Sequence, residues 1–508
     1  MKWERLALGV RILSVLAPGY LHPDEFFQSP EIIADAVFDS VNASVPWEFN
    51  CLEKGKLYRS IVPAAILSGV PYVLANTLGF VTGTVLLVGP RLMMLVFSLI
   101  MEQLMGSLFG SKARFVFSTS WIAMVLLVRP FSNALELYLL LLACFLAKKH
   151  KPALLGITCG FGMFNRITYP AFVAPVVCLA LQRLDLHYTT GIGKRGLQPS
   201  MTSRANNLML HSMRIAIGFL SAATFHIIVD SLYASSLDAC TDFLLQIGNF
   251  KVVLTPLNSL LYNTDTSNLA IHGLHPRITH LAVNMQLLFT PLWFFGLFTK
   301  QGSSSGDRPS LFALRGSIVF SLLVLSSAPH QEARFLLPLL VPVSVLCADI
   351  VSDRPRIRNL WLVFNAILAI FYGGFHQAGV VPGLLSIGET AEELNVRCVA
   401  TYETYMSPRF LLAGYQGKLD VFHDFGGAGP IEVVEKLGTL GCTQGRWLLM
   451  LPSTAMGDLQ RELGLGPGSL QSVFRPHFSG ERPTLRWTDQ ALEIHIFNLP
   501  GPQLSGLE

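Results

Sequence analysis

The chain has 508 residues, of which 51% are hydrophobic and only 14% are charged, and its mean hydropathy is +0.48. A soluble domain carries about 25% charged residues, and apolar runs recur along most of this sequence. Composition therefore excludes a soluble protein and predicts a polytopic membrane protein. The formal net charge of +4 is too small to indicate a nucleic-acid-binding surface.

Residues 1–20 form a short apolar segment with a basic start, and no small-residue cleavage site follows it. We therefore expect a retained first membrane helix rather than a cleaved signal peptide. The loop that follows, about 21–60, carries two adjacent carboxylates, Asp24 and Glu25, after Pro23. One interpretation is structural, because acids at the start of a helix complement its dipole. The other is catalytic: one carboxylate acts as a general base for an acceptor hydroxyl, while its neighbour positions the acceptor.

The same loop contains the sequon Asn42-Ala43-Ser44, which predicts N-glycosylation at Asn42 and a luminal position in the secretory pathway. Cys51, Cys240, Cys398 and Cys442 would then lie in an oxidising space where disulfides form, although the sequence does not specify the pairing. The eight cysteines show no metal-binding spacing, which argues against a structural zinc.

From residue 61 onward the sequence consists of apolar segments, nearly all without charge. They lie at 61–90, 92–110, 115–128, 137–147, 153–165, 167–182, 215–229, 281–299, 316–329, 335–348 and 359–375. Several are shorter than the roughly 20 residues that a helical span needs, so we expect broken helices and re-entrant pieces. In particular, part of 61–80 is expected to be interfacial or re-entrant, and 153–182 to return to its starting side as a pair of half-helices or short spans.

Basic clusters set the predicted orientation in the membrane. They lie at 148–151, in a Gly/Ser-containing linker at 183–204, at 300–308 and at 354–358. The positive-inside rule places all four in the cytoplasm, together with the N-terminus. The other polar clusters then fall together on the luminal side, at 22–25, 129–136, 258–280 and 330–334. They predict a luminal cavity lined with carboxylates, histidines and arginines, which suits proton transfer and a phosphate-bearing lipid.

Cationic side chains in these luminal clusters are candidates for holding a phosphate, since fixed positive charge stabilises a phosphate leaving group. They are Arg277, Arg334, His272, His275, His280 and His330. Alternatively, the arginines extend to the interface from helix ends, and the histidines are satisfied core residues. No metal site is predicted, because Pro276 disfavours the helical geometry that would align His272 with His275.

Residues 376–508 differ in composition from the rest, since short apolar strand-like pieces at 447–451 and 492–497 alternate with Gly/Pro turns. We predict a small α/β luminal domain here, with nothing catalytic in it. The predicted fold class is therefore an all-α polytopic membrane domain over 1–375, followed by this domain.

Several motifs resemble those of glycosyltransferase family 22, the GT-C-fold mannosyltransferases of the endoplasmic reticulum that use dolichyl-phosphate mannose. In chain order they are His22-Pro23-Asp24-Glu25-Phe26-Phe27-Gln28, Tyr58-Arg59-Ser60, Arg129-Pro130-Phe131-Ser132-Asn133-Ala134-Leu135-Glu136, Thr255-Pro256-Leu257-Asn258 with Tyr262-Asn263, His272-Gly273-Leu274-His275-Pro276-Arg277, and His330-Gln331-Glu332-Ala333-Arg334-Phe335. Each motif alone is weak, but together and in this order they are specific.

The resemblance implies an inverting single displacement from dolichyl-phosphate mannose at the luminal face of the endoplasmic reticulum membrane. It implies no nucleotide sugar, cofactor or metal. Asp24 is the first choice for the base and Glu25 the second, because the sequence cannot separate adjacent carboxylates. His330 and Arg334 would hold the dolichyl phosphate, with Glu332 orienting Arg334. Further substrate-binding candidates are His22, Arg129, His272, His275 and Arg277.

Within the family, the Phe26-Phe27 pair and the 272–277 loop favour the members that add an α-1,2-linked fourth mannose to the third mannose of the GPI-anchor precursor. The third-mannose step and mannosyl transfer to the N-glycan precursor are the alternatives. A lipid transporter or scramblase, an alternative of another class, would also use broken helices and intramembrane charges. Against it, no internal repeat is seen and the charges cluster on one face. A catalytically silent subunit of a glycosylation complex is a further alternative.

Overall fold

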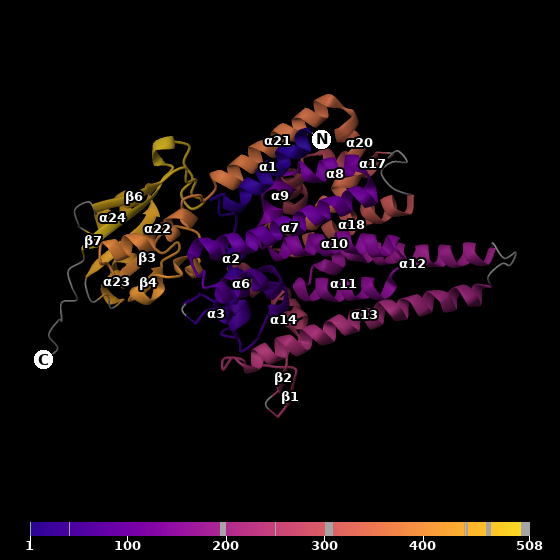
Figure 1. Ribbon diagram of the computed structural model, residues 1–508, viewed down its shortest axis with the longest axis horizontal. Helices are drawn as coiled ribbons and strands as arrows, with labels where there is room; N and C mark the ends of the chain where they lie inside the picture. The colour runs from indigo at the N-terminus through magenta and orange to yellow at the C-terminus, as the bar shows by residue number, and fades with distance from the viewer. Residues whose placement is uncertain are drawn as a thin grey trace. The chain divides into compact units, whose positions relative to one another are not determined.

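The computed structural model describes residues 2–39, 41–193, 200–248, 250–299, 308–440, 442, 445–463 and 469–498. Figure 1 shows the helices and strands coloured along the chain. The chain divides into two compact units that interleave along the sequence. The first unit comprises Met1–Arg11, Pro46–Ile66 and Met94–Asn365. The second comprises Ile12–Val45, Leu67–Met93 and Ala366–Glu508. Helices α1 (Lys2–Leu16), α7 (Gly83–Phe109) and α21 (Pro355–Gly374) run from one unit into the other, as does the helical segment Ile61–Leu78.

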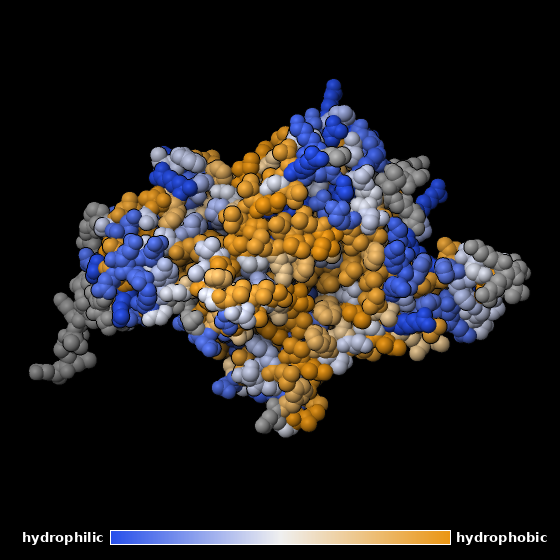
Figure 2. All heavy atoms as spheres, viewed as in Figure 1, coloured by the Kyte–Doolittle hydropathy of each residue, from blue (hydrophilic) through white to orange (hydrophobic). Residues whose placement is uncertain are grey.

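Within the described residues, six helical segments are long and apolar enough to cross a membrane. They are Ile61–Leu78, α7, α12 (Tyr169–Gly193), α13 (Met201–Ser235), α18 (Arg308–Ser327) and α21. The first combines α5 (Ile61–Ala64), a π-helical turn (Ala65–Gly69) and α6 (Val70–Leu78). Hydrophobic side chains also face outward on these helices, as Ile217 and Leu220 do on α13. Figure 2 shows hydrophobic residues over much of the visible face of the helical region, including α10 and α11. The predicted multi-span membrane protein is confirmed.

The prediction of broken helices is also confirmed. Two pairs of consecutive helical segments are long and apolar enough to cross a membrane only when each pair is taken together, and each pair is sharply bent. The pair α8 (Ser111–Ser118) and Trp121–Val128 is bent by 65°. The pair His280–Phe289 and α17 (Leu292–Phe298) is bent by 99°. If each pair crosses as one span, the described residues hold up to eight spans. Trp121–Val128 contains α9 (Trp121–Met124) and the 3-10 helix η2 (Leu126–Val128), and His280–Phe289 contains a π-helix (His280–Asn284) and α16 (Met285–Phe289).

Other helices of the first unit are α4 (Trp47–Asn50), α10 (Ser132–Lys148), α11 (Pro152–Asn165), α14 (Thr255–Thr264), α15 (Thr266–Ile271), the 3-10 helix η4 (Ala333–Leu339), α19 (Leu340–Leu346) and α20 (Ala348–Asp353). The predicted linker at 183–204 is wrong at both of its ends. Polar residues there continue the helices: α12 runs on to Gly193, and Ser200 caps the start of α13 by accepting a hydrogen bond from the Ser203 amide. Residues 194–199 and 300–307 of the predicted basic loops lie outside the described residues.

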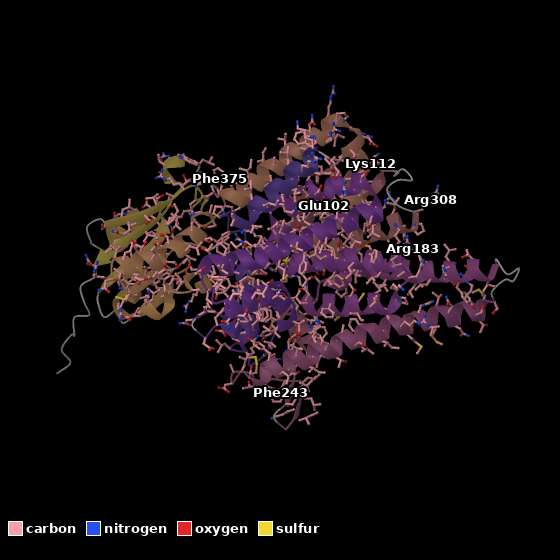
Figure 3. All side chains as sticks on the ribbon, viewed as in Figure 1. Glu102, Lys112, Arg183, Phe243, Arg308 and Phe375 are labelled. Atoms are coloured by element: carbon pink, nitrogen blue, oxygen red, sulfur yellow. A yellow bond between two sulfur atoms is a disulfide. The ribbon has the colours of Figure 1, made fainter. Side chains whose placement is uncertain are left out.

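Helices α11 and α13 lie side by side (Figure 1) and meet through small residues. A Cβ atom built on Gly156 of α11 would come within 1.9 Å of the Ile215 carbonyl oxygen, and one on Gly218 of α13 within 2.0 Å of the Ala153 carbonyl oxygen. Backbone therefore packs against backbone. Small residues at a spacing of four are typical of helices that associate inside a bilayer, where lipid removes the hydrophobic driving force and close packing replaces it. A polar contact joins two other helices: Arg183 on α12, labelled in Figure 3, donates to Ser310 Oγ on α18 at 2.6 Å.

The loop region of the first unit is held by a disulfide between Cys51 and Cys240. A two-stranded antiparallel hairpin, β1 (Leu245–Ile247) and β2 (Phe250–Val252), follows the second cysteine. In the second unit a disulfide joins Cys398 to Cys442. These are the four cysteines that the predicted topology places in one oxidising space, and the structure supplies the pairing.

The C-terminal part of the second unit is a mixed five-stranded sheet in the order β4-β3-β5-β7-β6. Its strands are β3 (Cys398–Thr401), β4 (Val421–Asp424), β5 (Arg446–Pro452), β6 (Ser469–Phe474) and β7 (Leu492–Asn498). Strand β3 is parallel to β4 and β5, and β7 is antiparallel to β5 and β6. The accompanying helices are α22 (Val380–Glu393), α23 (Pro430–Thr439) and α24 (Met456–Leu463). The predicted small α/β region is confirmed, whereas its boundary at residue 375 stays a prediction.

We expect Gly156→Ala to destabilise the protein, because the added methyl group would push the two helix backbones apart. Overpacking of this kind costs about 1–3 kcal/mol, which would lower the unfolding temperature measured in detergent. Gly191→Ala on α12 is the matched control, since open space surrounds that position and alanine is the better helix former by up to about 1 kcal/mol. Equal unfolding temperatures for the two variants would contradict the close approach of α11 and α13.

Candidate active site

The predicted carboxylates open the short helix α2 (Asp24–Phe27) in the second unit. Pro23 precedes the helix in helical conformation, and the two acids occupy its first turn, where they complement the helix dipole. Successive side chains on a helix point about 100° apart, so Asp24 and Glu25 meet different surroundings. The Glu25 side chain has no exposed surface, whereas that of Asp24 is 18% exposed.

Glu25 is engaged in a buried ion pair. Its Oε1 atom lies 2.6 Å from Nη2 of Arg91, a residue of α7 with 1% exposure. Arg91 also donates through Nη1 to the carbonyl oxygens of Val15 and Ala17 at 3.2 and 3.1 Å. Its guanidinium lies 5.8 Å from the Phe26 ring centroid. Sequence reasoning missed Arg91, although a single charge between two apolar runs is a signal for a partnered side chain.

Asp24 keeps accessible surface and is held by neighbours from its own turn. Gln28, four residues on, donates from Nε2 to Asp24 Oδ2. The Asp24 backbone N–H donates to Nδ1 of His22 at 3.1 Å. Because Nδ1 accepts this hydrogen bond, neutral His22 carries its proton on Nε2. The predicted residues His22 and Asp24 are thus brought together, with Gln28 as an orienting residue.

A second cluster lies in the first unit, in the loop that leads into η4. Glu332 bridges two of the predicted residues: its Oε1 atom is 2.7 Å from His330 Nε2, and its Oε2 atom accepts a hydrogen bond from Arg334 Nε. The predicted orientation of Arg334 by Glu332 is therefore present in the structure. The other ring nitrogen of His330 lies 2.9 Å from the Gly273 carbonyl oxygen.

His330 is thus placed between two acceptors, and only the doubly protonated imidazolium can donate to both. Burial lowers the pKa of His330, but the hydrogen bonds to the Glu332 carboxylate and the Gly273 carbonyl outweigh burial. The net effect raises this pKa above its ordinary value of 6.5. The cluster therefore favours a cationic His330 beside Arg334.

A third cation joins this cluster from the 129–168 region. The guanidinium groups of Arg166 and Arg334 lie 5.1 and 5.3 Å from the centroid of the Phe335 ring. Arg166 donates to Ser132 Oγ at 3.0 Å and lies 3.7 Å from the buried carboxylate of Glu136. Arg166 is a second residue that sequence reasoning missed, and its signal was an arginine between the apolar runs 153–165 and 167–182. Two guanidinium groups of this kind suit an oxyanion.

The remaining predicted histidines surround His330. The ring centroids of His272 and His275 lie 5.9 and 5.8 Å from that of His330. His272 Nε2 forms a 3.0 Å hydrogen bond with the Tyr262 hydroxyl, and its ring stacks on Trp47 at a centroid distance of 6.0 Å. The predicted loop 272–277 thus joins the 330–335 segment.

Three predicted residues have other surroundings. Arg277 is exposed, and its carbonyl oxygen accepts a 3.1 Å hydrogen bond from Gln331 Nε2. Arg129 is completely buried between η2 and α10, and the structure gives it no exposed surface. His280 is also buried, with its amide donating to the Gln331 side chain. Over the described part of the chain, no three His, Cys, Asp or Glu side chains form a group that could hold a metal ion.

Comparison with known proteins agrees with these motifs. Residues 5–409 match the profile of the Alg9-like mannosyltransferase family. The chain is 34% identical to human "GPI alpha-1,2-mannosyltransferase 4", with 98% of this chain and 93% of that protein covered. It is 30% identical to "GPI mannosyltransferase 4" of Debaryomyces hansenii, covering 82% and 80% of the two chains, and 28% identical to that of Saccharomyces cerevisiae, covering 75% and 71%.

One solved structure has a distant likeness to the chain, the oligosaccharyltransferase of Archaeoglobus fulgidus. It shares 12% identity, with a TM-score of 0.39 over 92% of this chain and 71% of that chain. A likeness at this level carries no argument about the site.

Glu25→Gln and Arg91→Met are each expected to leave one charge buried without its counter-charge. Breaking a buried pair in this way costs about 3–5 kcal/mol, so both variants should accumulate as folded protein at a small fraction of the wild-type level. Asp24→Asn should accumulate normally, because its side chain is partly exposed. The double variant Glu25→Gln/Arg91→Met should recover part of the loss, since it removes both charges. Normal levels and unfolding temperatures for both single variants would contradict a stabilising pair.

Proposed function

Since this chain belongs to the Alg9-like mannosyltransferase family, we propose that it adds mannose to the glycan of the GPI-anchor precursor. The chain is a mannosyltransferase with several membrane spans. We assign it the α-1,2-linked fourth mannose, transferred to the third, because human and fungal relatives similar over most of the chain carry names for that enzyme. These names support this step over the third-mannose and N-glycan alternatives, and family membership disfavours a lipid transporter.

The proposed donor is dolichyl-phosphate mannose, and the proposed reaction is a single displacement with inversion. A bond forms between the 2-hydroxyl oxygen of the third mannose and C1 of the donor mannose. The bond from C1 to the phosphate oxygen breaks, and the dolichyl phosphate leaves with the electron pair. The hydroxyl proton passes to a carboxylate of the enzyme. This balance needs no cofactor.

Asp24 is the proposed base. The observation that carries this choice is the contrast between the two adjacent carboxylates: Glu25 is buried and paired with Arg91, while Asp24 is reachable and oriented by Gln28. A base must come within hydrogen-bond reach of the proton that it abstracts, and a fully buried, paired carboxylate does not. Glu25 then has a positioning role, because it fixes the start of α2.

His330, Arg334 and Arg166 are the proposed binders of the donor phosphate. They form a cluster of cationic groups whose geometry is set by Glu332, Glu136 and the Phe335 ring. Fixed donors of this kind stabilise the charge that develops on a leaving phosphate. His272, His275, Arg277 and His22 are proposed as further contacts of donor or acceptor.

The endoplasmic reticulum membrane, with the chemistry on the luminal side, is the proposed location. The disulfides support it, since each joins two of the four cysteines that the predicted topology places in the lumen. The free cysteines of the described residues, Cys144, Cys159, Cys178 and Cys347, lie in or beside the apolar helices.

The test is mass-resolved analysis of GPI precursors in cells that lack this protein. The four-mannose precursor should be absent from these cells, while its three-mannose predecessor remains. Wild type should restore the four-mannose precursor, whereas Asp24→Asn should not. Asp35→Asn is the matched control, because it makes the same substitution at an exposed position of α3 (Pro30–Val37) and should restore the product. Accumulation of two-mannose species would assign the third-mannose step instead, and an unchanged precursor profile would overturn the proposal.

Donor affinity is expected to depend on pH through His330. Because the pKa of His330 is raised, the imidazolium is fully present below about pH 6.5 and is lost as the pH rises through the folded pKa. The KM for dolichyl-phosphate mannose should therefore increase over that rise, and His330→Gln should show a high KM without this dependence. Glu332→Gln should move the increase to lower pH, since it removes the carboxylate that holds the proton. An unmoved pH profile in Glu332→Gln would show that another group titrates.

A further inference from the structure

A cavity of about 240 Å³ lies in the second unit beside the predicted glycosylation site. The Asn42 side chain is part of its lining. The rest of the lining, called the wall below, comes from the C-terminal part of the chain and consists of three aliphatic residues with Arg409, Asp420 and Phe422. A sequon asparagine therefore lines a cavity whose other walls are more than 350 residues away in the sequence.

The wall has the mixed chemistry that a sugar ring requires. The guanidinium of Arg409 lies 5.4 Å from the centroid of the Phe422 ring. An aromatic ring can pack against the C–H face of a pyranose, while a guanidinium and a carboxylate can bond to hydroxyl and amide groups. Asp420 supplies the carboxylate and also pairs with Arg397 at 3.3 Å.

The sequon and the wall are held together by one buried carboxylate. Glu31 on α3 accepts a 3.2 Å hydrogen bond from the Ser44 amide through Oε2. Through Oε1 it accepts hydrogen bonds from the backbone amides of Arg409 and Phe410. Glu31 has no exposed surface, so these contacts are protected from water. The distance between the sequon and the cavity wall is therefore defined by the fold.

We propose that the first N-acetylglucosamine of a glycan on Asn42 occupies this cavity and joins the 21–60 loop to the edge strand β4. The inference rests on the luminal placement within the proposed function. Asn42 is exposed enough to be modified. Attachment forms a bond from Asn42 Nδ2 to C1 of the sugar, breaks the bond from C1 to the diphosphate of a lipid-linked oligosaccharide, and releases one amide proton.

The size of the cavity selects one sugar rather than several. Pockets for drug-sized ligands have about 300–1,000 Å³, and this cavity is smaller, so the remaining sugars would extend into solvent. A ring that is tethered at Asn42 has an effective concentration in the millimolar range. Contacts too weak to hold a free monosaccharide are then sufficient.

The full-length protein, purified in detergent from eukaryotic cells, provides the test. Endoglycosidase H cuts between the first two sugars and leaves one N-acetylglucosamine, whereas peptide N-glycosidase F cuts at the asparagine. The folded protein should be trimmed by the first enzyme and resist the second until it is denatured. Its unfolding temperature should be unchanged after trimming to one sugar, and Ser44→Ala, which prevents attachment, should lower it. Ser44→Thr retains the sequon and is the matched control.

Phe422→Leu should leave glycosylation intact and speed native cleavage by peptide N-glycosidase F roughly tenfold, equivalent to an aromatic contact of about 1.4 kcal/mol. Three results would each overturn the inference. The first is the absence of a glycan on Asn42, and the second is cleavage at the asparagine that is as fast in folded as in denatured protein. The third is a trimmed protein whose unfolding temperature equals that of the Ser44→Ala variant. The GPI-precursor profile of cells carrying Ser44→Ala separates these from a failure of the proposed function, because that profile should match wild type.

Discussion

The buried pair of Glu25 and Arg91 sets the geometry of the carboxylate site. Arg91 belongs to α7, which is long and apolar enough to cross a membrane. Its guanidinium binds Glu25 as well as the carbonyl oxygens of Val15 and Ala17 near the end of α1. One side chain thus ties α7, the end of α1 and the start of α2 together. Because Glu25 is held inside, its neighbour Asp24 is turned to the accessible side.

Buried polar groups in the first unit are also paired with one another, since a bilayer offers no water to satisfy them. Arg11 of α1 pairs with Glu102 of α7 at 2.9 Å, and Glu102 is labelled in Figure 3. Asp230 of α13 accepts hydrogen bonds from Ser60 Oγ at 2.9 Å, from the Ile61 amide and from Thr255 Oγ1, both at 3.0 Å. These contacts connect helices to the loops that carry the motifs. These buried polar contacts therefore hold helices and loops together, and they fix the segments that carry the residues proposed for chemistry.

The proposed roles of the two clusters rest on charge and exposure. Around Asp24, Gln28 and His22 orient the side chain and the backbone, and the carboxylate keeps accessible surface through which it can take a proton. Around His330 the acceptors Glu332 and Gly273 favour the cation, which is the form proposed to bind the donor phosphate. Each cluster is built from side chains held by a second layer of contacts, Gln28 in one case and Glu332 and Glu136 in the other. Such support is what keeps a site in one geometry.

The sequence by itself determined the membrane class, the broken helices, the small α/β region and the motif residues around His330. It could do so because hydrophobic periodicity, prolines and loop polarity are local properties. Only the tertiary structure decided which of Asp24 and Glu25 is buried, which cysteines pair, and that Arg91 and Arg166 belong to the sites. The linker predicted at 183–204 was wrong because polar residues there continue two helices. The physical reason is common to all of these. Ion pairs and disulfides join residues that are distant in sequence. The burial of a side chain on a helix depends on which other parts of the chain pack against it.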